Sequence, residues 1–283
     1  MSDAMGEGSS GPVSHVTSRD NPLIKELRKL SQDSTAYRKQ GRVWLEGDHL
    51  CRAALLRGCK PVLAVFSESF WPLAQSQWAR EAIKSIVIPD SLLPEISALE
   101  SPARMGFVIE LPATLSVQSD TASVILDRVQ DAGNVGSILR SAAAFGFSQI
   151  IALRGTAALW SPKVLRAGMG AHFALRLVES VDSDALAVLT VPIVVTSSHH
   201  GSFLHQLIRQ KELPTPCAWV MGHEGQGVSD DLMARASLKV RIDQPGGEES
   251  LNVAAAAAIC LHASALVKID IAAQFSPAGG WPA

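Results

Sequence analysis

The sequence lacks the features that would mark a membrane-spanning, secreted or metal-binding protein. Its longest clean apolar stretch, Val253 to Leu261, is far shorter than the roughly 18 residues that a membrane span needs. Met1 to Pro12 are small and polar, so residues 1–14 are predicted to be a disordered lead; they have neither the basic region nor the apolar region of a secretory signal. Neither a disulfide framework nor a zinc site is indicated by the four widely separated cysteines, Cys51, Cys59, Cys217 and Cys260. We therefore expect a cytoplasmic protein with no metal and no membrane partner.

An excess of charge of one sign is also missing. The formal net charge of −2 would not by itself indicate a nucleic-acid partner. The charge is uneven, however, because His15 to Lys60 contain ten Lys or Arg against five Asp or Glu. The positive charges cluster at Lys25, Arg28, Lys29, Arg38, Lys39 and Arg42. This group is either a solvated helix face or an RNA-binding patch that contacts phosphates, and composition does not decide between them.

The first part of the chain alternates between strand and helix patterns. A helix is predicted over Asn21 to Leu30, with Asp20 or Asn21 as its cap and Pro22 in its first turn. Strands are expected at Val43 to Glu46, Val62 to Phe66, Ser85 to Ile88 and Gly106 to Glu110, and further helices at His49 to Arg57, Trp71 to Ala79 and Leu92 to Leu99. These patterns predict a small α/β domain over residues 15–111, followed by a Pro-, Ser- and Thr-rich linker at 112–122.

The second part, residues 123–272, shows a clearer alternation of apolar strands and helices. Its expected strands are Ser123 to Leu126, Gln149 to Leu153, Leu175 to Glu179, Pro192 to Ser197, Ala218 to Met221 and Lys239 to Ile242. Apolar strands separated by helices predict a parallel sheet covered on both faces. Ligands of such sheets bind at the carboxyl ends of the strands. Residues 273–283 are left as a tail.

The first loop with a candidate function is Arg128 to Arg140, which follows a strand. Gly133 and Gly136 bracket Asn134, which we expect to cap the next helix, and Arg140 follows one to two turns later. Such a helix start can hold a phosphate. An ordinary strand-to-helix turn is the alternative.

The second loop, Val220 to Ser229, holds Glu224 among Gly222, Gly225 and Gly227. The glycines allow the backbone to approach a ligand closely, and the carboxylate can accept hydrogen bonds from a ligand hydroxyl or amine. A dinucleotide site is the rival interpretation, but the G-x-G-x-x-G pattern that it needs is absent from this loop.

The third loop, Val240 to Val253, passes from a strand through a Pro-Gly-Gly turn into a helix. Ser250 and Asn252 stand at the helix start, where hydroxyl, amide and free backbone N–H groups converge. They either contribute to a ligand site or only cap the helix, in which case Leu251 would be the first core residue.

Taken together and in this order, the loops resemble the three motifs of the SpoU, or TrmH-like, branch of the SPOUT methyltransferases. The motifs appear as Gln130 to Gly136 with Arg140 following, as Gly222 to Gly227 and as Ser250 to Val253. The resemblance covers about Ser123 to Lys268. The basic amino-terminal domain is similar to the ribosomal-protein-like (L30e-like) substrate-binding domain of many family members.

The resemblance implies a parallel-sheet α/β-knot (SPOUT trefoil) domain that acts as a homodimer. It also implies S-adenosylmethionine as the cofactor and a ribose 2′-hydroxyl of structured RNA, most of all ribosomal RNA, as the methyl acceptor. Two alternatives stay open. The substrate is transfer RNA, or the chain is an RNA-binding ribosome factor that has lost catalysis.

The family's site residues map onto this sequence position by position. The resemblance implies that the cofactor is held by Thr196, Gly222, Ile242 and Leu251, and that catalysis involves Asn134, Arg140, Glu224, Ser250 and Asn252. We expect Arg140 to hold a phosphate and Glu224 to orient Arg140. Three departures from the family pattern, at Ala132, His223 and the pair Asp243-Gln244, affect the expected side-chain contacts.

Overall fold

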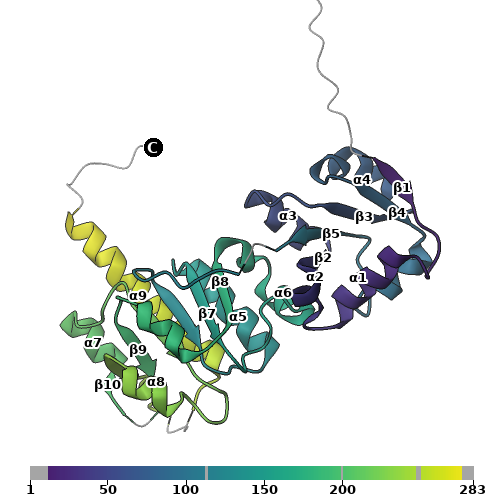
Figure 1. The fold of residues 1–283 in the computed structure, drawn as a ribbon. Helices are drawn as coiled ribbons and strands as arrows, with labels where there is room; N and C mark the ends of the chain where they lie inside the picture. Colours follow the sequence, from purple (N-terminus) through teal and green to yellow (C-terminus); the bar gives the residue numbers. More distant parts are fainter. Residues whose placement is uncertain (1–11, 112–113, 199, 247–249, 276–283) are drawn as a thin grey trace, which may run out of the picture. The chain divides into compact units, whose positions relative to one another are not determined.

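A computed structural model describes residues 12–111, 114–198, 200–246 and 250–275. Most of the predicted lead and of the predicted tail lies outside these described residues. The contacts divide the chain into two compact units (Figure 1). Unit 1 contains the residues up to 113 together with Trp160–Phe173, and unit 2 contains the remainder. The prediction had placed residues 160–173 with the second part of the chain.

Unit 1 begins with a short strand and a capped helix. Helix α1 (Pro22–Gln32) starts as expected, because the side chain of Asn21 accepts a hydrogen bond from the backbone N–H of Leu23 and Pro22 occupies the first turn. Its buried face includes Ile24, Leu27 and Leu30. Strand β1 (Val13–His15) precedes it and pairs with the sheet, although Val13 and Ser14 fall in the predicted lead.

The sheet of unit 1 has five strands in the order β1-β4-β3-β5-β2. The strands after β1 are β2 (Arg42–Glu46), β3 (Leu63–Ser67), β4 (Ser85–Ile88) and β5 (Met105–Glu110), and β5 runs antiparallel to both neighbours. The helices are α2 (Ala36–Gln40), α3 (Asp48–Leu56), α4 (Trp71–Gln77) and α6 (Pro162–Gly168), with short 3₁₀ helices η1 (Ala79–Glu81) and η3 (Ala171–Ala174).

One predicted helix of unit 1 is a different element. The pattern at Leu92 to Leu99 forms the 3₁₀ helix η2 (Asp90–Ile96) instead of an α-helix. Pro94 lies inside it, and proline has no backbone N–H to donate to an α-helical hydrogen bond. The apolar residues of the pattern, including Leu92, Leu93 and Ile96, are nevertheless buried as their spacing predicted.

Unit 2 is built on a seven-stranded sheet in the order β10-β12-β9-β11-β6-β7-β8. Its strands are β6 (Ser123–Leu126), β7 (Gln149–Leu153), β8 (Arg176–Val181), β9 (Ile193–Thr196), β10 (Ser202–Phe203), β11 (Ala218–Met221) and β12 (Leu238–Arg241). All pairs that it forms are parallel. Every residue of β6, β7 and β11 is buried, as a sheet covered on both faces requires. The predicted α/β fold class, with its parallel sheet, is confirmed.

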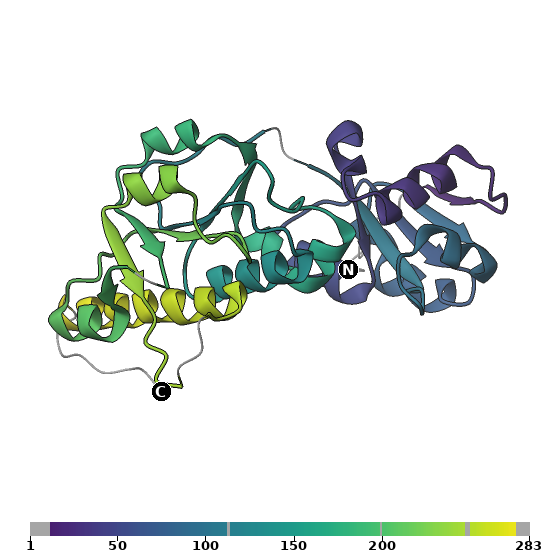
Figure 2. The ribbon, with the colours of Figure 1, turned by 90° about the horizontal axis from the view of Figure 1, so that it is seen from below.

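The covering elements of unit 2 are α5 (Ala132–Ala144), α7 (Leu204–Gln210), α8 (Asp230–Arg235), α9 (Val253–Phe275) and the 3₁₀ helix η4 (Ser183–Val188). Helix α9 packs beside α5, and the two views show this pair along one face of the sheet (Figures 1 and 2). In the described part of the chain, no helix combines the length and the apolar character that crossing a bilayer demands.

The order of strands changes direction at β6. From β6 the chain adds β7 and β8 on one side, then crosses to β9 and later inserts β11 between β9 and β6. Strand β12 is likewise inserted between β9 and β10, which is consistent with the threaded topology that the resemblance implies. In open parallel sheets, ligands bind outside the carboxyl ends of the strands at such a point of reversal.

Candidate active site

A pocket of about 600 Å³ lies at the carboxyl ends of β9, β11 and β12. Its walls come from three segments: residues 196–198, residues 222–228, and residues 240–256 in part. The four predicted cofactor-binding residues, Thr196, Gly222, Ile242 and Leu251, all line it. The second and third loops, distant in the sequence, therefore share one cavity.

Glu224 connects the second loop to the first. Its carboxylate accepts hydrogen bonds from the backbone N–H of Gln130 (3.2 Å), from the backbone N–H of Asp131 (3.1 Å) and from Nδ2 of Asn134 (3.1 Å). Partial burial raises the pKa of Glu224, but these hydrogen bonds outweigh it and hold the pKa below its ordinary value. The group is therefore an anion at neutral pH, fixed against the start of α5.

Asn134 and Asn252 extend this connection to the third loop. Nδ2 of Asn252 donates to Oδ1 of Asn134 at 2.9 Å. Oδ1 of Asn252 accepts from the backbone N–H groups of Ala254 and Ala255, so this residue caps α9 as its position in the sequence suggested. A continuous chain of hydrogen bonds from Glu224 through Asn134 to Asn252 thus joins all three loops.

The prediction that Asn134 caps α5 was wrong. The cap is Asp131, whose carboxylate accepts a hydrogen bond of 2.7 Å from the backbone N–H of Asn134. Aspartate caps as well as asparagine does, and its charge interacts favourably with the helix dipole. The side chain of Asn134 is consequently free to bind Glu224 and Asn252.

Arg140 lies apart from these residues within one chain. It is exposed on α5, it does not line the pocket, and its side chain makes no hydrogen bond or ion pair with the described residues. The expected contact between Glu224 and Arg140 is not formed in this chain, because the carboxylate is occupied by the start of α5. Ser250, in contrast, is exposed at the edge of the pocket.

A second set of contacts, which the sequence analysis did not identify, holds the first and second loops together. Asp127 is almost fully buried at the end of β6 and accepts hydrogen bonds from the backbone N–H of Ser229 (2.7 Å) and from Nε of Arg128 (3.0 Å). Arg128, with a left-handed φ of 61°, also donates from Nη1 to the side chain of Gln226 (2.9 Å). The sequence does carry a signal for Asp127, because a carboxylate directly after an apolar strand must find hydrogen-bond donors when it is buried.

The walls of the pocket fit a ligand with both apolar and hydrogen-bonding groups. Ile242 and Leu251 supply apolar surface. Gly222 packs so closely on the backbone of Gly227 and Val228 that a Cβ there would overlap it, so the tight turn of this loop requires glycine at this position. The buried Oε1 of Gln244 has no hydrogen-bond partner among the described residues and remains available to a donor. These features suit the adenosyl and amino-acid parts of S-adenosylmethionine.

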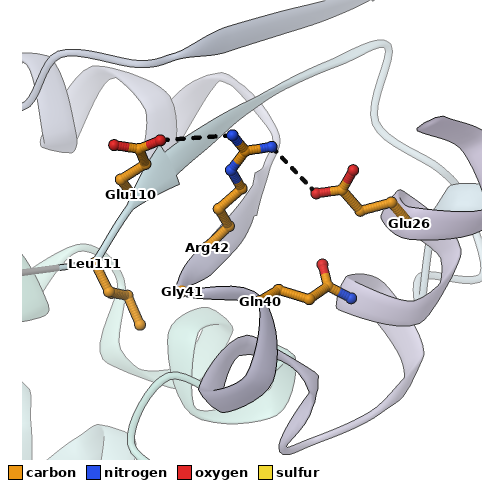
Figure 3. A pocket seen from close by; sticks show the side chains of 6 residues that line it. All are labelled: Glu26, Gln40, Gly41, Arg42, Glu110 and Leu111. Atoms are coloured by element: carbon orange, nitrogen blue, oxygen red, sulfur yellow. Dashed lines mark hydrogen bonds and ion pairs between the residues drawn. The ribbon is translucent and has the colours of Figure 1, made fainter.

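Three of the six predicted RNA-binding residues are engaged with carboxylates in unit 1. Arg28 pairs with Glu95 at 2.5 Å, and Lys25 pairs with Asp20 at 3.2 Å. Figure 3 shows Arg42 between Glu26 and Glu110, at 3.4 and 3.5 Å, beside Gln40, Gly41 and Leu111. The acids that pair with them therefore offset much of the positive charge of this group.

The other three predicted RNA-binding residues are exposed. They are Lys29, Arg38 and Lys39, on α1 and α2. Arg38 lies over the ring of Tyr37 and donates to its hydroxyl oxygen at 3.2 Å. In the described part of the chain, no group of three or more His, Cys, Asp or Glu side chains is arranged to hold a metal ion.

Two family models match the chain. The SpoU rRNA methylase family matches residues 121–262, and the MRM3-like substrate binding domain matches residues 21–105. The first match contains all nine residues predicted for catalysis and cofactor binding. The second contains the six predicted RNA-binding residues.

Individual relatives also match this chain over most of its length. An uncharacterized tRNA/rRNA methyltransferase of Synechocystis is 29% identical over 272 residues, covering 88% of this chain and 93% of the relative. The 23S rRNA (guanosine(2553)-2′-O)-methyltransferase of Bacillus subtilis is 28% identical over 254 residues, covering 88% and 98%. The crystal structure of an AdoMet-bound rRNA methyltransferase from Sinorhizobium meliloti has a TM-score of 0.76 at 28% identity, covering 90% and 98%.

The pocket, the hydrogen-bonded loops and the sheet that positions them all fall inside the first family match, which spans about half of the sequence. The chain belongs to the SpoU rRNA methylase family.

Proposed function

We propose that the protein transfers the methyl group of S-adenosylmethionine to a ribose 2′-hydroxyl of RNA, with ribosomal RNA as the favoured substrate. The observation that carries this proposal is that hydrogen bonds of Glu224, Asn134 and Asn252 join three loops distant in the sequence, two of which line one pocket. The names of the Bacillus subtilis and Sinorhizobium meliloti relatives support it. Transfer RNA is the second candidate substrate, because the Synechocystis relative is named for both RNAs.

The cofactor is held by the residues that line the pocket. S-adenosylmethionine supplies an electrophilic methyl group on a sulfonium centre. Ile242 and Leu251 provide apolar contact, and the backbone at Gly222 can approach the ligand closely. Thr196 keeps its own loop in place, since its hydroxyl donates to the backbone oxygen of Val220 at 3.1 Å. Such positioning accounts for much of the rate of a direct displacement.

Arg140 positions the RNA and stabilises charge. A guanidinium group is a cation that has hydrogen-bond donors and no acceptor, so Arg140 cannot take the proton of the ribose hydroxyl. It holds the phosphate beside the target ribose and stabilises the emerging alkoxide, while the hydroxyl of Ser250 contacts phosphate. Asn134 and Asn252 orient the nucleotide from the joined loops.

The active protein is a homodimer in which Arg140 serves the pocket of the other subunit. Helix α9 carries an exposed apolar stripe, Ile259, Leu266 and Ile269, whose spacing puts it on one face. This helix packs beside α5, the helix that bears Arg140. A second copy that covered the stripe would bury apolar area and bring Arg140 towards another set of loops.

The dimer can be tested by light scattering coupled to gel filtration. We expect Leu266→Glu to give the mass of a single chain, because a charge would be buried in the stripe. Lys268→Glu, a charge change away from the stripe on the same helix, should leave the mass of the wild type unchanged. A monomeric wild-type protein would contradict the dimer.

The amino-terminal unit, predicted over residues 15–111, binds the RNA substrate, and the protein acts in the cytoplasm. The match to a substrate-binding domain over residues 21–105 supports the first proposal. The second is supported by the four cysteines, which are all free.

The reaction is tested with the wild type, Arg140→Ala and the control Arg154→Ala, which removes an exposed arginine of the same unit. Calorimetry measures binding of S-adenosylmethionine, and primer extension maps 2′-O-methylation on transcribed ribosomal RNA and transfer RNA. We expect Arg140→Ala to abolish turnover and to leave cofactor affinity nearly intact. Full activity of this variant would reject the role of Arg140, and a wild type that does not bind the cofactor would make the chain an RNA-binding factor.

A further inference from the structure

Unit 1 contains a second pocket, of about 420 Å³, that is separate from the predicted basic group. Its walls are the start of α3, the span from Phe70 to Trp78 around α4, and the segment that leads into β5. Two arginines, Arg52 and Arg104, and two aromatic rings, Phe70 and Trp78, stand among its lining residues. Leu73, half exposed, adds apolar surface.

Each arginine of this pocket lies over a ring. Cζ of Arg52 is 4.8 Å from the ring centroid of Trp78, and Cζ of Arg104 is 4.8 Å from that of Phe70. Such cation–π contacts hold a guanidinium group in place before any ligand arrives. Less side-chain freedom is then lost when the group binds.

The two guanidinium groups are also free of acids. Among the described residues, neither Arg52 nor Arg104 makes an ion pair or a side-chain hydrogen bond, whereas Arg28 and Arg42 of the predicted group pair with glutamates. The pocket contains one carboxylate, Asp48, against the two positive charges. Its net charge therefore attracts an anion.

We propose that this pocket binds an unpaired nucleobase, together with an adjacent phosphate, of the RNA substrate. Bases in single-stranded RNA stack on aromatic rings and on arginine planes, and phosphates attract the same guanidinium groups. Asp48 and Gln77, which also line the pocket, can hydrogen-bond to the edge of a base. The proposal rests on RNA being the substrate, and it assigns recognition in unit 1 to a surface other than the predicted basic group.

The test measures binding of the full chain to a fluorescein-labelled single-stranded RNA of 12 nucleotides by anisotropy. The same strand in a perfect duplex is the comparison. The double variant Arg52→Ala/Arg104→Ala should bind the single strand roughly ten- to a hundredfold more weakly, the usual range for lost base stacking. Arg57→Ala, which removes an exposed arginine at the other end of α3, should bind like the wild type.

A second variant separates stacking from charge. Arg52→Lys/Arg104→Lys keeps both positive charges and loses the planar groups. With 2-aminopurine in the RNA, we expect the wild type to change the fluorescence of the base and the lysine variant to do so much less. Both proteins should show a similar dependence of affinity on salt concentration.

Several results would overturn the proposal. The first is a double alanine variant that binds the single strand as tightly as the wild type does, and the second is an equal loss of affinity in Arg57→Ala. The others are a wild type that binds duplex and single strand with equal affinity, and a wild type that does not measurably bind the single strand. Displacement of the RNA by polyglutamate at the same concentration as by unlabelled RNA would indicate an acidic-peptide site instead. Methylation assays are independent of these outcomes. If Arg52 and Arg104 govern binding but no RNA is methylated, the pocket stands and the proposed reaction fails.

Discussion

Removal of the Glu224 carboxylate should destabilise unit 2 and slow methyl transfer together. Glu224→Ala loses three hydrogen bonds, two from backbone N–H groups and one from Asn134. A hydrogen bond to a charged group contributes about 1.5–3 kcal/mol when buried, but this group is largely exposed, so we expect about 2 kcal/mol for the three together. In a unit of this size, that corresponds to a fall in Tm of about 4–8 °C.

The fall in the rate of methyl transfer in Glu224→Ala should be larger than the loss of stability explains. The first loop is no longer held against the second, and misplacement of reacting groups by about 1 Å can cost a hundredfold in rate. Glu224→Gln should lie between the wild type and the alanine variant, because one carboxylate oxygen becomes an NH₂ group that faces a backbone donor. Glu212→Ala, an exposed carboxylate on the same unit, is the control for both the Tm and the rate.

The pH dependence follows from the lowered pKa of Glu224. A carboxyl group whose native pKa lies below its unfolded pKa stabilises the fold above the unfolded value, and this stabilisation is lost as the pH falls through the native value. The difference in Tm between the wild type and Glu224→Ala should therefore be constant from about pH 6 to 8 and shrink in acid. Equal Tm values and equal kcat/KM for the two proteins at neutral pH would refute the role of Glu224.

Three further substitutions test other parts of the structure. Gly222→Ala should weaken S-adenosylmethionine binding at least tenfold by calorimetry, because the new Cβ meets backbone. The Cβ of the control variant Gly225→Ala makes only ordinary contacts, so this variant should bind the cofactor normally. Equal affinities of the two variants would contradict the close packing at Gly222. Asp127→Ala should lower the free energy of unfolding by about 2 kcal/mol in urea titrations, and the exposed Asp230→Ala by less than about 0.5 kcal/mol. Arg42→Ala should change RNA affinity less than twofold in anisotropy titrations, because two carboxylates already offset its charge. A larger loss of affinity would indicate that Arg42 contacts the RNA.

Local patterns predicted most of the regular structure. The apolar runs at β4, β6, β7 and β11 were placed with the bounds that the structure has, because short apolar stretches between turn residues are strong strand signals. The start of α1 at Pro22, after the Asn21 cap, was likewise readable from local chemistry.

Elements that depend on distant partners were not predictable in the same way. Strands β1 and β10, of three and two residues, lie at the edges of their sheets and are too short to leave a periodic pattern. Residues 160–173 group with unit 1 through contacts between segments far apart in the sequence. The 3₁₀ helix η2 shows the reverse case, in which a local residue, Pro94, overrode an apolar spacing that favoured an α-helix.

The sequence by itself determined which loops carry chemistry, because glycines, capping residues and polar side chains after apolar strands are local features. The tertiary structure decided which groups meet. Glu224 binds a backbone N–H 94 positions earlier in the chain, and Asn252 binds a side chain 118 positions earlier. Such hydrogen bonds depend on the strand order, which inserts β11 between β9 and β6 and so brings the loops to one edge of the sheet. The same holds for Arg28 and Arg42, whose charges looked available in the sequence and are offset by acids on other elements of the fold.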